Sequence, residues 1–202
     1  MCELILASKS PRRRELMKLL GFPFRCITPQ VEEDIVEGEK PDQHVIRLSE
    51  RKAFNVGENF DHGIIIGSDT IVVLDNEILE KPRSADEALY MIMKLQGHTH
   101  HVFTGFALYD SKTKKTFSSY ETTEVTMREI SLDIAKKYVE TDEPLDKAGS
   151  YGIQGYGAVL IKSVNGCYFN VMGLPLSSLM EALFTFSDGR FDYFGKTMES
   201  LQ

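Results

Sequence analysis

The stretch GIIIGSDTIVVLDNEILEKP, residues 63–82, decides the fold class. Its apolar run predicts a fully buried strand, and Asp75-Asn76 predicts a turn into a short return strand. A carboxylate, Asp69, interrupts the run, and burying it is costly unless it is paired, hydrated or bound to metal. A lysine or backbone N–H groups could satisfy Asp69, but the nearby Gly67 favours close approach of a ligand. Asp69 is therefore the first candidate for a catalytic carboxylate.

Helices and strands alternate on both sides of this stretch. Before it, the pattern predicts strands at 4–7 and 24–27, a helix at 12–20, and a helix capped by Asp42 that runs to about 57. After it, we expect a helix between the capping residue Ser84 and Gly97, strands at 101–109 and 116–128, and a helix from Ser131. A hairpin around Asn165-Gly166 within 157–171 and an amphipathic helix within 174–186 follow. This mixture indicates an α/β fold with a mixed sheet.

Composition narrows the class of protein. The chain has 202 residues, of which 42% are hydrophobic, and fits one ordinary globular domain. It has no apolar run long enough for a membrane span and no basic start of a secretory signal, so we expect a cytoplasmic protein. The three cysteines lack metal-site spacing and are expected to be reduced. A net charge of −7 disfavours nucleic acid and anionic membranes as partners, so an anionic ligand would need a local cationic pocket or a metal ion.

The segment SKSPRRREL, residues 8–16, places three arginines in the first turn of a predicted helix. Ser10 suits the N-cap and Pro11 the first position, but acidic residues are preferred at this positive end of the helix dipole. With Leu16, Leu19 and Leu20 as the buried side, Arg12 and Arg13 project toward that side and Arg14 toward solvent. A bound anion explains this arrangement, and the alternative is an exposed, charged first turn.

Weaker signals elsewhere could belong to the same site. Clustered oxygens at 31–34 suit Mg²⁺ or Mn²⁺, although such a loop is more often only solvated. The return strand could bring Lys81 beside Asp69, whereas the sequence does not orient Lys52. In the glycine-rich loop 142–157, the amide of Gln154 could match the O4 and N3–H edge of uracil or thymine, or could simply lie in a mobile loop. The histidines at 98–101 lack a partner cluster and suggest surface or helix-end packing.

Taken together, these motifs closely resemble the Maf family of nucleoside triphosphate pyrophosphatases. The resemblance rests on LILASKSPRRREL (4–16), VEED (31–34), RLSERKA (47–53), IGSDTIV (66–72), LEKP (79–82), LDKAGSYGIQG (145–155) and VMGLP (171–175). Ser68 departs from the alanine common before the aspartate. The resemblance implies an elongated single α/β domain over residues 1–185, related to inosine-triphosphate pyrophosphatases, with helices flanking a mixed central sheet and a deep nucleotide cleft. It assigns no role to the tail, 186–202.

The resemblance also implies residue roles. Asp69 matches the family's proton acceptor, and Arg12, Thr70 and Gln154 match the positions that mark the dTTP/UTP-preferring subgroup. Further binding positions match Ser8, Arg13, Glu33, Lys52 and Lys81. The implied reaction is hydrolysis between the α and β phosphates with Mg²⁺ or Mn²⁺, which Glu33 and Asp69 could hold while the arginines and lysines bind the triphosphate.

Several alternatives stay open at this point. The same reaction could act on modified pyrimidine or purine nucleotides, or the protein could be a nucleotide-binding regulator of cell division with little turnover. Asp69 could act chiefly as a base or chiefly as a metal ligand. The oligomeric state is also open, with a homodimer among the alternatives.

Overall fold

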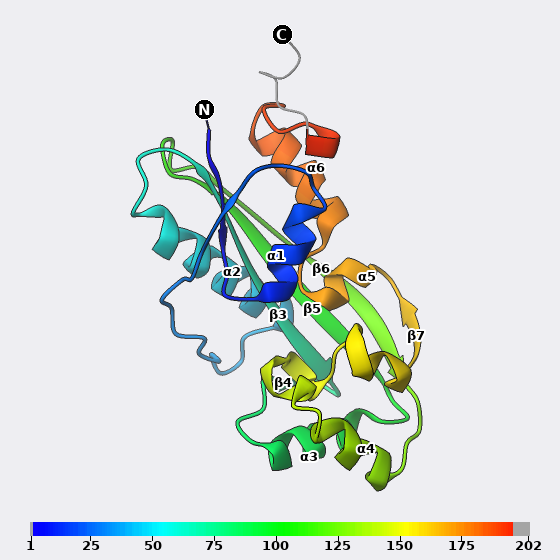
Figure 1. The fold of residues 1–202 in the computed structure, drawn as a ribbon. Helices are drawn as coiled ribbons and strands as arrows, with labels where there is room; N and C mark the ends of the chain where they lie inside the picture. Colours follow the sequence, from blue (N-terminus) through cyan, green and yellow to red (C-terminus); the bar gives the residue numbers. More distant parts are fainter. Residues whose placement is uncertain (1, 196–202) are drawn as a thin grey trace. The chain divides into compact units, whose positions relative to one another are not determined.

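The computed structural model describes residues 2–195. Its main element is a mixed β-sheet (Figure 1). Its strands are β1 (Leu4–Ala7), β2 (Arg25–Ile27), β3 (Ile64–Leu74), β4 (Glu77–Leu79), β5 (Thr99–Asp110), β6 (Thr116–Met127) and β7 (Ile161–Asn165). They follow the order β2-β1-β3-β5-β6-β7, and β4 pairs with β3. The helices are α1 (Pro11–Lys18), α2 (Pro41–Gly57), α3 (Ala85–Leu95), α4 (Leu132–Val139), α5 (Tyr168–Met172) and α6 (Leu176–Phe186). The predicted α/β class with a mixed sheet is confirmed.

The chain divides into two compact units. The first unit contains the chain up to Asp69, Thr104–Glu121 and the chain from Gly173. The second contains Thr70–Phe103 and Thr122–Met172. The strands β3, β5 and β6 therefore each contribute residues to both units. No described helix has the length and apolar content needed to span a bilayer.

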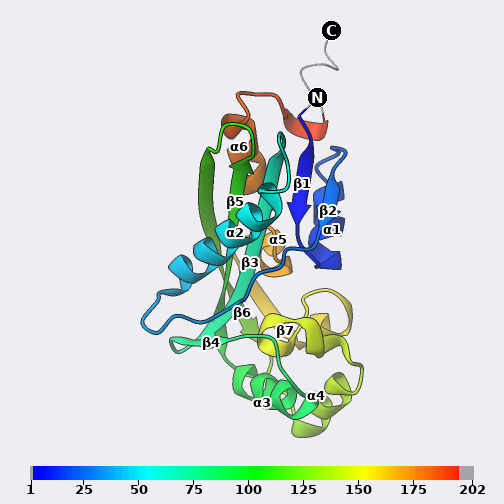
Figure 2. The ribbon, with the colours of Figure 1, turned by 90° about the vertical axis from the view of Figure 1, so that its left-hand side faces the viewer.

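In the first unit, β1 lies between β2 and β3 and is parallel to both. The strand is entirely apolar because both of its faces are buried, as expected for a parallel sheet. The helix α2 packs over β3 and β5 (Figure 2). Val45, Leu48 and Ala53 form its buried side.

Two glycines allow this close packing of α2. A Cβ atom on Gly67 of β3 would overlap the carbonyl oxygen of Ser49 and lie 2.8 Å from the backbone nitrogen of Ala53. A Cβ atom on Gly105 of β5 would overlap the carbonyl of Val45 in the same way. The sequence-based interpretation of Gly67 as a point of ligand approach is therefore wrong, because the group that approaches it is the backbone of α2.

In the second unit, β3 turns into β4 through Asp75 and Asn76, which both have positive φ. These residues favour the left-handed conformation that a tight hairpin requires, and the predicted hairpin is confirmed. The helix α3 begins after Ser84, whose side chain accepts a hydrogen bond from the Glu87 N–H. The helices α3 and α4 lie side by side in both ribbon views (Figures 1 and 2).

The predicted hairpin around Asn165-Gly166 is wrong. The first arm exists as β7, which pairs antiparallel with β6, but the residues of the second arm form the helix α5. The side chain of Asn170 in α5 donates to Val102 O and to Thr123 Oγ1. These buried polar contacts stabilise the helix at a position where local turn chemistry alone favours a strand.

Three smaller predictions are also corrected. Leu19 is 66% exposed because α1 ends at Lys18, and Met17 takes its place in the core beside Leu16. The N-cap of α2 is Lys40, since Pro41 occupies the first helical position and Asp42 lies within the first turn. His100 is fully buried in β5 and contacts the hydroxyl of Tyr151, whereas its neighbours at 98 and 101 are exposed as predicted. The tail residues 196–202 lie outside the described residues.

Candidate functional site

Asp69 lies at the centre of a charged cluster in the first unit. Asp69 is 7% exposed, and its Oδ1 accepts a 2.6 Å hydrogen bond from the Nζ of Lys52, which is 4% exposed. The same ammonium forms a 2.6 Å ion pair with Glu33 Oε1. Lys52 therefore joins a carboxylate of the central strand to a carboxylate of the loop before α2. This arrangement supplies the partner that burial of Asp69 requires.

The close packing of α2 explains why Lys52 reaches Asp69. Gly67 lies two residues before Asp69, on the same side of β3. Its missing side chain lets Ser49 and Ala53 approach the strand, and Lys52 lies between them in sequence. The glycine thus controls the distance between the two elements that carry the ion pair.

A second set of contacts holds the residue just before Asp69. Arg13 donates from Nε to the carbonyl oxygen of Gly173 at 2.7 Å and from Nη1 to that of Ser68 at 2.8 Å. The Ser68 hydroxyl lies 2.9 Å from the carbonyl oxygen of Gly105 and 3.1 Å from that of Gly173, and its one proton can be donated to either. The Gly173 carbonyl thus lies within reach of two donors, and the departure from alanine at position 68 adds one of them. These contacts immobilise the backbone that carries Asp69.

The three arginines of α1 differ in their surroundings. Arg14 is exposed, as the helical spacing predicted, while Arg12 and Arg13 are partly buried. Desolvation by burial lowers the pKa of Arg13, an effect that the charges of Asp69 and Glu33 oppose. Two of its guanidinium nitrogens bind carbonyls, so the role implied by the resemblance, binding of the triphosphate, stays a prediction.

We expect Arg13→Lys to lower the free energy of unfolding by about 1–2 kcal/mol, because an ammonium cannot reproduce two directed guanidinium bonds. The matched change Arg14→Lys, on the exposed side of the same helix, should stay within about 0.5 kcal/mol of the wild type. Urea unfolding followed by circular dichroism measures both values. Equal effects of the two substitutions would contradict the supporting role of Arg13.

The start of α1 is organised by serines. Ser8 is buried, and its Oγ accepts the Ser10 N–H at 3.1 Å. Ser10 is the N-cap, as predicted, and its Oγ accepts the Arg13 N–H at 3.4 Å. Since the cap already satisfies this amide, an anion at this helix end would depend chiefly on arginine side chains.

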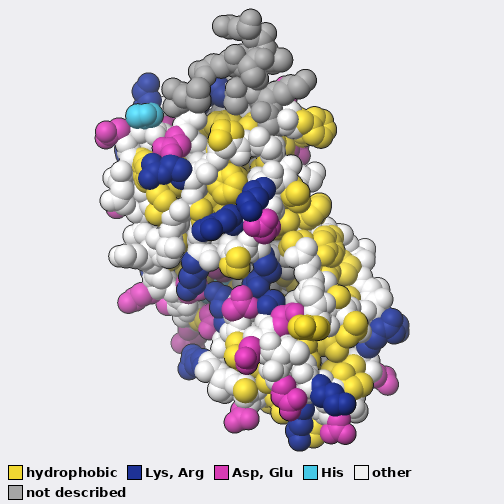
Figure 3. Space-filling view, in the orientation of Figure 1, with side chains coloured by type: hydrophobic (Ala, Val, Ile, Leu, Met, Phe, Trp, Pro, Cys, Tyr) yellow, Lys and Arg dark blue, Asp and Glu magenta, His cyan; other side chains and the backbone are white. Residues whose placement is uncertain are grey.

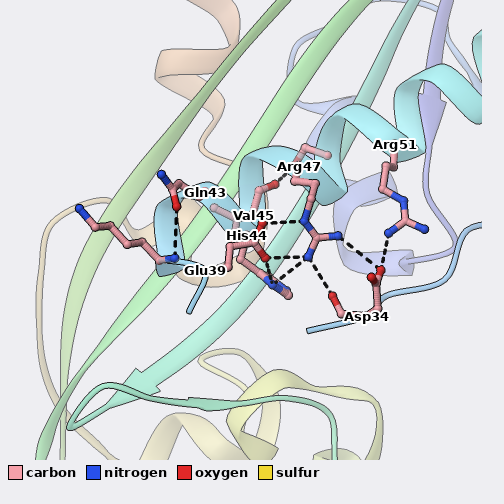
Figure 4. A network of polar contacts seen from close by, with 9 residues as sticks. Asp34, Glu39, Gln43, His44, Val45, Arg47 and Arg51 are labelled. Atoms are coloured by element: carbon pink, nitrogen blue, oxygen red, sulfur yellow. Dashed lines mark hydrogen bonds and ion pairs between the residues drawn. The ribbon is translucent and has the colours of Figure 1, made fainter. Parts of the chain in front are cut away.

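The loop that carries Glu33 is fastened to α2 by its next residues (Figure 4). Arg47 donates to the Asp34 carbonyl at 2.9 Å and forms two bonds with Glu39, at 2.6 and 2.7 Å. Arg51 also pairs with Asp34, and buried His44 contacts Glu39 at 3.0 Å. Hydrogen bonding from Arg47 lowers the pKa of Glu39, which keeps that carboxylate charged. The helix that carries Lys52 therefore also holds the segment that follows Glu33.

Three predicted site residues belong to the second unit. Thr70 is partly buried in β3, while Lys81 and Gln154 are exposed. The register pairs Leu79 with Val72, so the chain after β4 runs back along β3 in the direction of Thr70. Gln154 immediately precedes the 3₁₀ segment Gly155–Leu160. The structure thus groups Glu33, Lys52 and Asp69 within the first unit and assigns Thr70, Lys81 and Gln154 to the second.

The carboxylates of Glu33 and Asp69 could hold a divalent cation if phosphate oxygens supplied some of its other ligands. The described residues contain no group of three or more His, Cys, Asp or Glu side chains that could hold a metal ion. Glu33 and Asp69 nevertheless converge on one Lys52 ammonium, so both carboxylates reach the same point. Mg²⁺ is commonly held by one or two carboxylates together with substrate phosphates and water. The three cysteines are free, as expected.

Charged side chains of both signs are interspersed on the face shown in Figure 3. Recognition of an anion would therefore depend on a local cation set, as the net charge of −7 already indicated.

Comparison with known proteins assigns the family. The model of the family described as "Maf-like protein" matches residues 3–186. The chain belongs to the Maf family. Maf relatives named "dTTP/UTP pyrophosphatase" include proteins from Desulforamulus reducens, Bacillus cytotoxicus and Photorhabdus laumondii. The first is 45% identical over 89% of this chain and 94% of its own. The second is 45% identical over 94% and 98%, and the third 44% over 93% and 97%.

The sequence did not single out every residue of structural importance. Glu143 and Tyr138 make several hydrogen bonds around the loop that carries Gln154, yet neither breaks a local sequence rule. Glu143 lies within the loop already marked as glycine-rich, and the closely spaced glycines were the signal available there. Closely spaced glycines indicate that another group approaches the backbone there, but they do not show which residue supplies that group.

Proposed function

We propose that this Maf protein hydrolyses dTTP and UTP to the nucleoside monophosphate and pyrophosphate. The observation that carries the proposal is the ion-paired cluster of buried Asp69, buried Lys52 and exposed Glu33, in a chain about 45% identical to proteins named for this activity. A nucleotide-binding regulator without turnover would not need a buried carboxylate of this kind. The cluster therefore supports an enzyme over a binding protein.

In the proposed reaction, water attacks the α-phosphorus. An oxygen–phosphorus bond forms to the water, the bond to the bridging α–β oxygen breaks, and pyrophosphate leaves with the bonding electron pair. Asp69 orients the water and accepts its proton. Lys52 holds Asp69 in place and, with Arg12, stabilises charge that develops on the phosphates. Bound Mg²⁺ or Mn²⁺, held by Glu33 and Asp69, would supply further neutralisation of that charge.

The decisive assay offers the protein a panel of ordinary and modified triphosphates with Mg²⁺ or Mn²⁺ and separates the products by chromatography. We expect monophosphate and pyrophosphate, with dTTP and UTP as the preferred substrates. A diphosphate with inorganic phosphate would overturn the bond assignment. Preference for a purine or modified nucleotide would mean that the same reaction acts on a different substrate. Tight nucleotide binding without turnover would support a regulatory protein instead of an enzyme.

The side chain of Gln154 is expected to select the base. Its amide can donate to O4 and accept from N3–H of uracil or thymine, a pairing that the 4-amino group of cytosine disrupts. Replacing it with alanine should lower kcat/KM for dTTP about tenfold and leave kcat/KM for dCTP within about twofold, since a lost hydrogen-bond pair affects only the matching base. Steady-state kinetics on both nucleotides test this, and an unchanged substrate profile would count against base recognition by Gln154.

A further inference from the structure

The loop that carries Gln154 is closed on itself within the second unit. A Cβ atom on Gly157 would overlap the carbonyl oxygen of Gly152 and lie 3.0 Å from its nitrogen. The backbones at the two ends of this short loop are therefore in contact, and Gln154 lies between them with its side chain exposed. Such a loop presents its central side chain in a defined direction only while both ends are held.

Two side chains hold the ends. The hydroxyl of Tyr138, near the end of α4, accepts the Gly152 N–H at 3.0 Å and donates to Glu143 Oε1 at 2.9 Å. Glu143 also accepts the Tyr156 N–H at 2.7 Å through Oε2 and the Gly157 N–H at 3.0 Å through Oε1. One carboxylate thus receives two amides from the far end of the loop, while its phenol partner receives the amide of the near end.

The loop fits closely around Glu143. Gly155 has φ of +80°, and a Cβ atom there would lie 2.5 Å from Glu143 Oε2. Tyr138 is 5% exposed, and burial raises the pKa of its hydroxyl above the ordinary value. The phenol therefore stays protonated and remains a donor to Glu143. Charge-assisted bonds of this kind are stronger than neutral ones and directional.

We propose that Glu143, together with Tyr138, is a positioning residue that sets the base preference by fixing the loop around Gln154. Glu143 acts through Gln154 and needs no contact with the nucleotide. This inference rests on the proposed function, because it assigns base recognition to Gln154. It adds two residues, from α4 and the segment Glu143–Asp146, to the determinants of specificity.

The test is Glu143→Gln, which preserves size but places an N–H₂ group opposite a backbone N–H in either amide orientation. Its matched control is Glu140→Gln, an exposed glutamate at the C-cap of α4 with the same change of charge. We expect the ratio of kcat/KM for dTTP to that for dCTP to fall about tenfold in Glu143→Gln and to stay unchanged in the control. Most of the fall should come from dTTP, with kcat/KM for dCTP preserved. Tyr138→Phe should change the ratio in the same direction.

A second measurement is independent of activity. Hydrogen exchange followed by NMR should show faster exchange of the Gly152, Tyr156 and Gly157 amides in Glu143→Gln, while amides of the central strand keep their protection. An unchanged ratio, or a loop that stays fully protected, would overturn the inference. Wild-type protein that does not distinguish dTTP from dCTP would instead reject the proposed base preference, and the exchange measurement would still test the role of Glu143 in fixing the loop.

Discussion

Asp69→Asn should lower turnover of dTTP by at least about 10³-fold, because the substitution removes both the proton acceptor and one carboxylate of the charged cluster. Asparagine has nearly the shape of aspartate but accepts a proton far less readily. Its Oδ1 can still accept a hydrogen bond from Lys52, so the geometry at the strand is preserved while the negative charge is lost. The expected result is therefore a folded, inactive protein.

The fold should survive because Lys52 keeps a second carboxylate. Its ion pair with Glu33 at 2.6 Å remains, so the buried ammonium is not left without a counter-charge. Asp110→Asn is the matched control, because Asp110 is also 7% exposed and serves a turn, accepting the N–H groups of Lys112 and Thr113. We expect Asp110→Asn to retain turnover, and both variants to show the wild-type circular dichroism spectrum. Near-wild-type activity of Asp69→Asn would remove its catalytic role.

The same variant separates a base from a metal ligand. Mn²⁺ binding can be followed by electron paramagnetic resonance in the presence of dTTP with a non-hydrolysable α–β link. If Asp69 serves chiefly as the base, Asp69→Asn should bind Mn²⁺ with nearly the wild-type affinity and still fail to turn over dTTP. If it is chiefly a ligand, Mn²⁺ affinity should fall together with activity, and Glu33→Gln should reproduce that loss.

Local patterns predicted most elements of the fold. β1 is an uninterrupted apolar run, Asp75-Asn76 marks the β3–β4 turn, and Ser84 and Ser131 cap α3 and α4. In each case the signal lies within a few residues of the structure that it produces.

The hairpin prediction at Asn165-Gly166 failed because contacts distant in sequence decide the structure there. The strand before it pairs with β6, and the helix after it depends on Thr123 and Val102, which are distant in sequence.

Two candidate residues stood out in the sequence because burial and charge conflict locally. Asp69 inside an apolar strand and Arg13 in the first turn of a helix both violate local preferences. In the structure Asp69 pairs with Lys52, and Arg13 donates to the carbonyl of Ser68, the residue before Asp69. The partner of Asp69 was not predictable, because the rotation of α2 over the sheet decides which of its side chains faces the strand. Glu143 and Tyr138 were missed for a similar reason, since nothing within a few residues of either one signals the distant amides that they bind.

Gly67 connects packing to the site and produces the second large effect. Any side chain at position 67 would hold α2 away from β3. Alanine would place its Cβ against the Ser49 carbonyl and 2.8 Å from the Ala53 nitrogen, and both are backbone atoms that cannot move aside like a flexible side chain. The helix must therefore shift as a unit. Lys52 would shift with it, so the ion pair with Asp69 would lengthen.

We expect Gly67→Ala to lower the free energy of unfolding by about 3 kcal/mol, the upper part of the range for overpacking in a close-packed core. For a chain of this size the melting temperature should fall by roughly 6–12 °C. Urea and thermal unfolding measure the loss, and kcat at 20 °C should fall as well, because Lys52 is displaced even in the folded protein. Gly38→Ala is the control: its added Cβ meets open space, and only its φ of +78° adds strain, on the order of 1 kcal/mol. If both variants lost the same stability, the close approach of α2 would not explain the glycine at position 67.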